Sequence, residues 1–544
     1  MWGGFVFLEW ELMGYSSVGW ELEFFFDGMS FIFLSVVMVV TGCVLRFSKF
    51  YMGGELNSNR FHCILGLFVL SMMALLMIPN LLGLMIGWDG LGIVSYLLVI
   101  YYPCSSSLSA GMITFLTNRL GDSFLMCGIV LLGLSAGDWF LMFDYEFIGL
   151  LVVVGGITKS AQYPFSAWLP AAMAAPTPVS SLVHSSTLVT AGVYLLIRCY
   201  MSLSEVCLEV LYWSSLVTLF VSGCAACFEF DLKKVVALST LSHVSIMVFS
   251  LSIGYPEMSF FHLVCHAVSK AMLFICVGFI IMGGSQDIRQ LGWDFSGSGW
   301  LKSYFFVSCA SLCGISFFSG YYSKDLILEG LMGSCSGGLG FLGFFIGVIF
   351  SSWYSIRLMF YGLFSGCSYG WMGVDGGLSS WEGESVHICC FPLFISSVML
   401  GGSGYLGLER FPGVIPSGWV KEVMIMIPYI GVIVFFFLVY EGFKSWKGMS
   451  KDGLSGGLMM FSFFEELGFL DRLSGQIWVK PVFVFGDMCY GYLDQGWLEM
   501  VGPGGLKSLS LFYLGGDSGK KSSWFSVSFL CYIFMIVMLG GMSL

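Results

Sequence analysis

Ionisable side chains stand inside apolar stretches that are long enough to cross a membrane. The clearest group is His262, His266 and Lys270, which follow one another at intervals of four residues. On a helix, positions i, i+4 and i+8 share one face, so these groups would lie about 6 Å apart along the axis. Ionisable residues at such depth usually face a bundle interior or a water path. The spacing therefore predicts a row of groups that carry protons or another small cation.

Further ionisable residues stand in other apolar stretches, and they are Asp89, Lys159, His184 and Lys324. A charged group at the centre of a spanning helix costs about 2.5–3.5 kcal/mol on insertion scales. In general, burial favours a neutral lysine and a nearby carboxylate favours the charged form, so a counter-ion that moves can load and unload a proton. Asp89 is the natural counter-ion for Lys159 in this scheme.

Other interpretations of the same residues stay open. A polar stripe can join helices without carrying an ion. Two histidines four residues apart can bind zinc, but Lys270 would repel the metal and no HExxH glutamate accompanies them. The 18 cysteines show no iron–sulfur spacing, and we interpret them as small buried hydrophobic residues.

The elements that must position these groups are membrane helices. Of the 544 residues, 57% are hydrophobic and only 10% are charged, whereas a soluble domain carries about 25% charged residues. The net charge of −11 argues against nucleic acid as a partner. The composition predicts an all-α polytopic membrane protein, with lipids around it.

A spanning helix needs about 20 apolar residues, and about 14 transmembrane helices satisfy this. The expected spans are 24–46, 62–80, 81–101, 108–134, 145–163, 176–199, 208–228, 233–253, 259–283, 302–321, 338–362, 386–403, 423–441 and 523–541. Pro164, Pro170, Pro176 and Pro178 follow Lys159 and indicate either a broken helix or an ordinary loop. The stretch 445–520 mixes apolar residues at helical spacing with charges, which predicts an amphipathic helix.

Several ordered motifs resemble the chain 5 family of mitochondrial NADH–ubiquinone oxidoreductase, respiratory complex I. The motifs are GWDGLGIVSYLL from Gly87, KSAQ from Lys159, WLPAAM from Trp168, PTPVSSLVHSST from Pro176, DLKKVVALST from Asp231, the stretch from His262 to Lys270, QDIR from Gln286 and YSKD from Tyr322. The amphipathic stretch resembles the long lateral helix of that family. It distinguishes chain 5 from the shorter chains 2 and 4.

The resemblance implies two inverted helical repeats, each with a broken helix, followed by a long C-terminal lateral helix. The expected parts are an N-terminal region with one span (1–61), an antiporter-like proton-channel core (62–365), peripheral spans (366–444), the lateral helix (445–522) and a final anchor (523–544).

The resemblance also assigns roles to individual positions. Asp89 matches the acidic partner of the first half-channel, Lys159 its broken-helix lysine and His184 the histidine that follows. His262 and His266 match the central histidines. Lys270 matches the central lysine, and Lys324 the second broken-helix lysine near the exit.

The function that the resemblance implies is proton translocation across the mitochondrial inner membrane, driven by quinone reduction elsewhere in the complex. No cofactor is expected in this chain, since flavin, iron–sulfur clusters and ubiquinone would be bound by other subunits. Expected partners are the other membrane-arm subunits, including chains 2 and 4. The alternatives are a subunit of a multi-subunit cation/proton antiporter and a non-pumping membrane scaffold.

Three positions depart from the family pattern. Asp89 stands where the family often has a glutamate, so its side chain is one methylene shorter. The segment from Ala172 to Pro176 lacks a glutamate that the family often carries. We also expect the two spans that commonly precede the one at 24–46 to be absent.

Overall fold

The computed structural model describes most of the first 407 residues and shorter pieces after them. The described ranges are 5–15, 18–134, 146–282, 286–290, 299–333, 338–364, 380–407, 429–433 and 481–499, with a few residues between and after them. The expected final anchor, most of the lateral helix and most of the span at 423–441 lie outside these ranges. The chain forms two units, Met1–Gly468 and Phe469–Leu544. Within the second unit, the structure describes helix over 481–499, including a π-helix over Tyr490–Leu498.

An antiparallel hairpin precedes the first helix. Its strands are β1 (Val6–Tyr15) and β2 (Val18–Phe26), and Glu9 pairs with Glu23 in the register. The sequence analysis expects a single span, at 24–46, in this N-terminal region and misses these strands. A signal was present over residues 8–12, where apolar residues alternate with Glu9 and Glu11 as they do in a strand.

Helices make up the rest of the described first unit. The first five are α1 (Gly28–Tyr51), α2 (Ser58–Met77), α3 (Leu81–Val99), α4 (Ser105–Leu134) and α5 (Glu146–Lys159). The later ones are α8 (Leu188–Arg198), α9 (Glu205–Phe228), α10 (Leu232–Ser252), α11 (Pro256–Met282), α12 (Gly299–Cys313), α13 (Ser319–Gly333), α14 (Gly338–Met359) and α15 (Ser380–Gly407).

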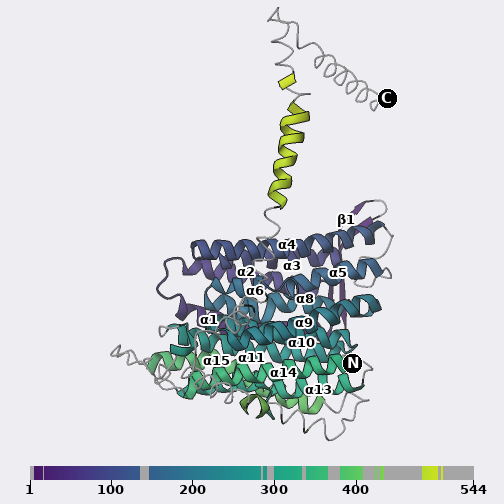
Figure 1. Cartoon of the computed structure of the whole chain (residues 1–544). Coiled ribbons are helices and arrows are strands. Elements are labelled where there is room, and N and C mark those ends of the chain that lie inside the picture. The colour runs from purple at the N-terminus through teal and green to yellow at the C-terminus, as the bar shows by residue number, and fades with distance from the viewer. Residues whose placement is uncertain are drawn as a thin grey trace, which may run out of the picture. The chain divides into compact units, whose positions relative to one another are not determined.

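Ten helices in the described ranges are long and apolar enough to cross a membrane. The predicted number of about fourteen is therefore not reached among these residues. Figure 1 shows the helices side by side, with α3 and α4 near one edge of the bundle and α13 and α14 near the other. The segments over Thr177–Arg198, α10 and α11 are almost wholly buried. The bundle thus has central helices that other helices shield from lipid.

The helical path is interrupted directly after Lys159. The helix α5 ends at Lys159, and the chain then passes through Ala161, whose φ is 54°, to the short helices α6 (Trp168–Ala171) and α7 (Thr177–Val179). A π-helix over Ser180–Thr187 follows and continues into α8.

The predicted single span at 302–321 is wrong. The structure has two helices there, α12 and α13, which are separated by a turn. Gly314 has a φ of 84° and Phe317 a φ of 74°, and this left-handed conformation ends a right-handed helix. The apolar run continues through the turn, so hydropathy alone could not locate it.

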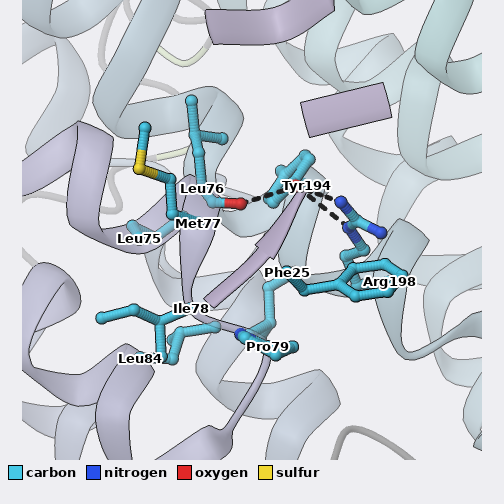
Figure 2. A pocket seen from close by; sticks show the side chains of 10 residues that line it. Phe25, Leu75, Leu76, Met77, Ile78, Pro79, Leu84, Tyr194 and Arg198 are labelled. Atoms are coloured by element: carbon cyan, nitrogen blue, oxygen red, sulfur yellow. Dashed lines mark hydrogen bonds between the residues drawn. The ribbon is translucent and has the colours of Figure 1, made fainter. Parts of the chain in front are cut away.

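An ion pair ties the hairpin and α1 to α8. The Arg198 guanidinium donates two hydrogen bonds of 2.7 Å to the Asp27 carboxylate and two more to the Tyr194 hydroxyl. Tyr194 in turn donates to the carbonyl of Leu76 at 3.2 Å (Figure 2). Burial by itself would raise the pKa of Asp27, but its bonds to Arg198 and Ser30 outweigh burial and hold that pKa below its ordinary value.

Candidate functional site

The first part of the candidate site surrounds Lys159 at the end of α5. The side chain is buried, and its Nζ donates to the carbonyl of Trp88 on α3 at 2.5 Å. The same Nζ lies 3.9 Å from the centroid of the Trp88 ring, in a cation–π arrangement. Trp88 therefore holds the lysine both through its backbone and through its ring.

Two carboxylates near this lysine share one arginine. Arg119 on α4 lies 3.2 Å from a carboxylate oxygen of Asp89 and 3.2 Å from one of Asp122. The indole of Trp88 donates to the other oxygen of Asp122 at 2.8 Å. Asp122 therefore contacts the tryptophan that contacts Lys159, and its side chain is more buried than that of Asp89.

The predicted counter-ion Asp89 is thus engaged with Arg119. No ion pair within 4.0 Å joins Asp89 to Lys159 in the described part of the chain. The sequence interpretation overlooked Arg119 and Asp122. Their signal was an Asn-Arg-Leu-Gly-Asp segment inside the expected span 108–134.

His184 lies on the π-helix that follows the interruption after Lys159. Its ring is buried, and its centroid lies 6.3 Å from that of Trp168. Trp168 donates its indole hydrogen to the carbonyl of Thr158, the neighbour of Lys159. Through Trp168, His184 thus lies in the same region as the first lysine. The π-helix that carries it is a kind of turn that is frequent at functional sites.

The second part of the candidate site lies on α11. This helix carries His262, His266 and Lys270, all of them buried. The Nζ of Lys270 donates to the Ser239 hydroxyl of α10. Nδ1 of His262 lies 2.8 Å from the Ser323 hydroxyl of α13. The row therefore reaches both neighbouring helices.

A buried histidine that the sequence interpretation overlooked joins this row. His243 on α10 lies with its Nδ1 3.2 Å from Nε2 of His262. Its ring centroid is 5.3 Å from that of His266. The available signal was the spacing of Ser239 and His243, which are four residues apart in an apolar helix and so share one face.

Lys324 forms the last part of the candidate site. Its Nζ donates to the carbonyl of Leu312 at 2.6 Å and to the Ser351 hydroxyl at 3.0 Å. These contacts join α13 to the end of α12 and to α14. Within the described ranges no group of three or more His, Cys, Asp and Glu side chains is arranged to hold a metal ion.

Comparison with known proteins identifies the family of this chain. The family model described as NADH:quinone oxidoreductase/Mrp antiporter, TM matches residues 79–351, and the model of the complex I chain 5 N-terminus matches residues 10–62. NADH-ubiquinone oxidoreductase chain 5 of Mytilus edulis is 40% identical over all of this chain and 95% of its own length. The chain belongs to this chain 5 family. The chain 5 protein of Aedes aegypti is 38% identical over 99% of this chain and 93% of its own.

Solved structures share the fold of this chain 5 family member. A chain of the Mrp complex from Dietzia sp. DQ12-45-1b superposes with a TM-score of 0.72 at 20% identity, over 96% of this chain and 60% of that one. A chain of an archaeal membrane-bound sulfane sulfur reductase superposes with a TM-score of 0.64 at 17% identity, over 78% and 87%. At these identities the likeness concerns the fold, which is an antiporter-like helical membrane fold.

Proposed function

We propose that this chain is a proton-translocating membrane-arm subunit of NADH:ubiquinone oxidoreductase in the mitochondrial inner membrane. In this role it contacts other membrane-arm subunits, including chains 2 and 4, and holds no redox centre of its own. The oxidation of NADH and the reduction of ubiquinone take place in other subunits. The segment 62–365 is the proton-carrying core, and 1–61, 366–444, 445–522 and 523–544 are its surrounding parts.

The observation that carries the proposal is the environment of three buried lysines. The Nζ atoms of Lys159, Lys270 and Lys324 donate to backbone carbonyls or hydroxyls. Among the residues that the structure describes, none of the three has a carboxylate within 4.0 Å. An ammonium group in such a place responds strongly to any charge that approaches or leaves. This is the property that a proton-carrying lysine requires.

The order of the groups supports a lateral path. Asp89, Asp122 and Arg119 surround the approach to Lys159, and His184 lies beyond it. The row on α11 follows, and Lys324 lies on α13, which contacts His262 through Ser323. Lifting one charge against about 200 mV costs roughly 4.6 kcal/mol. A pKa change of about three units in a generic lysine is worth roughly 4 kcal/mol, so switched lysines are sufficient in magnitude.

The test replaces Lys159 or Lys270 by methionine in the assembled complex. Methionine keeps most of the side-chain volume and removes the proton-binding group, so we expect fewer protons to be moved for each electron. The measurement is the ratio of protons to electrons in proteoliposomes during NADH oxidation. Lys234→Met is the matched control, because this lysine is half-exposed and pairs with Asp231 at 3.4 Å.

An unchanged ratio in both variants would contradict the proposed path. Sodium-dependent proton exchange without NADH would instead assign the chain to a cation/proton antiporter. If all these substitutions behave like the control, the polar residues only join helices.

A further inference from the structure

Three buried histidines, His243, His262 and His266, form one cluster between α10 and α11. The rings of His262 and His266 stand one helical turn apart on α11, with centroids 6.5 Å from each other. That separation leaves no direct hydrogen bond between them among the described contacts. A proton moving along α11 therefore meets a gap between two of its predicted carriers.

His243 lies across this gap from the neighbouring helix. Its centroid is 5.4 Å from that of His262 and 5.3 Å from that of His266, so it is nearer to each than they are to one another. The helices α10 and α11 are consecutive and antiparallel. For that reason Ser239 meets Lys270 one turn further along the same interface.

We infer that His243 is a proton-relay residue that passes protons between His266 and His262. The inference rests on the proposed function and adds a carrier to its path. A stripe of histidines on one helix alone would leave the gap unbridged.

Hydrogen bonds give the relay a direction. Ser323 donates its hydroxyl hydrogen to the carbonyl of Gly320 at 3.3 Å, and its oxygen lies 2.8 Å from Nδ1 of His262. In the tautomer that carries its hydrogen on Nδ1, His262 donates to this oxygen. Nε2 of His262 is then an acceptor, so Nδ1 of His243 is the donor in their bond of 3.2 Å. This assignment leaves Nε2 of His243 as the nitrogen that receives a proton.

The transfer balances in two steps. His266 starts as the protonated cation, gives the proton of one ring nitrogen to Nε2 of His243 and becomes neutral, while His243 becomes the cation. The Nδ1–H bond of His243 then breaks, and its proton binds Nε2 of His262. His266 has lost one proton, His262 has gained one, and His243 is neutral again with its hydrogen on the other nitrogen.

The surroundings of His243 fit such a carrier. The rings of His262 and His266 lie beside it from α11, and Lys270 and Lys324 are the charged groups that interact with it from α11 and α13. Nε2 of His243 and both ring nitrogens of His266 are buried and make no hydrogen bond within the described residues. Buried polar atoms normally have a partner. His243 and His266 do not form a hydrogen bond with each other in this arrangement, so the first transfer requires their rings to turn into hydrogen-bond contact.

The test is His243→Gln in the assembled complex, compared with Lys270→Met and with a control histidine. A glutamine amide can still donate to Nε2 of His262, but it cannot carry a proton at physiological pH. The control is His62→Gln on α2, where the ring bonds Ser48 and Ser58 outside the cluster. The readout is the ratio of protons to electrons in proteoliposomes, alongside the amount of assembled complex.

We expect His243→Gln to assemble normally and to lower the ratio as far as Lys270→Met does, while His62→Gln stays at the wild-type value. If Lys270→Met lowers the ratio and His243→Gln does not, the relay is overturned and the proposed function stands. If neither lowers it, the proposed function fails as well.

A second variant covers the case in which His243→Gln does not assemble. Ser323→Ala keeps all three histidines and removes the oxygen that orients His262. We expect a lowered ratio with unchanged assembly. A wild-type ratio in Ser323→Ala would overturn the hydrogen-bonded order on which the relay depends.

Discussion

At the residue scale, one arginine shared by two carboxylates sets the electrostatics around the first lysine. Arg119 lies 3.2 Å from oxygens of both Asp89 and Asp122. Asp122 is the more buried of the two carboxylates. Coulomb interactions weaken with solvent exposure, so Asp122 is the carboxylate whose charge matters more to Lys159.

We expect Asp122→Asn to slow proton transfer more than Asp89→Asn does. The amide can still accept from the Trp88 indole, so the variant removes charge while leaving that bond possible. Losing an interaction of about 1.4 kcal/mol slows a step about tenfold. Proton uptake by proteoliposomes during NADH oxidation measures the effect. Equal rates in the two variants would show that the carboxylates are interchangeable.

Sequence reasoning expected buried positions for the candidate residues, and the structure buries all of them except Asp89, whose side chain is 40% exposed. It could not supply their partners. The spacing of His262, His266 and Lys270 indicated one helical face, and α11 carries them in its buried part. The partner of Asp89 depends on how α3 packs against α4, which no local pattern encodes. His243 was overlooked for the same reason, because its role requires the position of α10 beside α11.

At the element scale, the Asp27–Arg198 ion pair holds the hairpin and α1 against α8. The pKa of Asp27 lies below its ordinary value of 3.8. Its contribution to stability is therefore fully present above that ordinary value and is lost as the pH falls through the lower pKa of the folded state. Breaking the pair leaves Arg198 without its carboxylate. Because both side chains are partly buried, the unpaired guanidinium then carries a desolvation cost.

We expect Asp27→Asn to destabilise the chain by about 1.5–3 kcal/mol, the range for hydrogen bonds to charged groups. The readout is the thermal dissociation temperature of the assembled complex, followed from pH 7 down to about pH 3, below the ordinary carboxyl pKa. The deficit relative to the wild type should shrink at the acidic end, because protonated Asp27 no longer pairs. A deficit that is constant with pH would contradict the ion-pair explanation.

Element boundaries were predictable where the chain changes polarity and unpredictable where it does not. The expected span 81–101 corresponds closely to α3 at Leu81–Val99. The interruption between α12 and α13 carries no proline, and its turn depends on the conformations of Gly314 and Phe317. Apolar composition continues through it, so a hydropathy window joins the two helices into one.

At the scale of the whole molecule, burial divides the helices into central and peripheral ones. In the apolar 18-residue stretches of α10 and α11, 94% of the residues are buried, whereas the share is 39% in the corresponding stretch of α2. Leu67, near the middle of α2, has 55% of its surface exposed. The peripheral helices therefore present apolar side chains to lipid or to neighbouring subunits.

We expect Leu67→Arg to reduce the amount of assembled complex. An arginine at the centre of a spanning helix costs about 2.5–3.5 kcal/mol on insertion scales, whereas one near the helix end can reach the interface. The matched control is Asn59→Arg, which is exposed next to the native Arg60 at the start of α2. Immunoblotting of native gels measures assembly. Equal loss in both variants would contradict apolar surroundings, lipid or a neighbouring subunit, around Leu67.

The hydrogen bond from Lys324 to Leu312 has a mechanical consequence. Leu312 stands at the last turn of α12, where carbonyl groups lack partners within the helix. The lysine ammonium fills this role from the following helix at 2.6 Å. If the side chain swings away to hand on a proton, the end of α12 loses its cap and can fray. Charge movement at this lysine and loosening of the α12–α13 turn are then a single event, so a chemical step is converted into a displacement of the backbone.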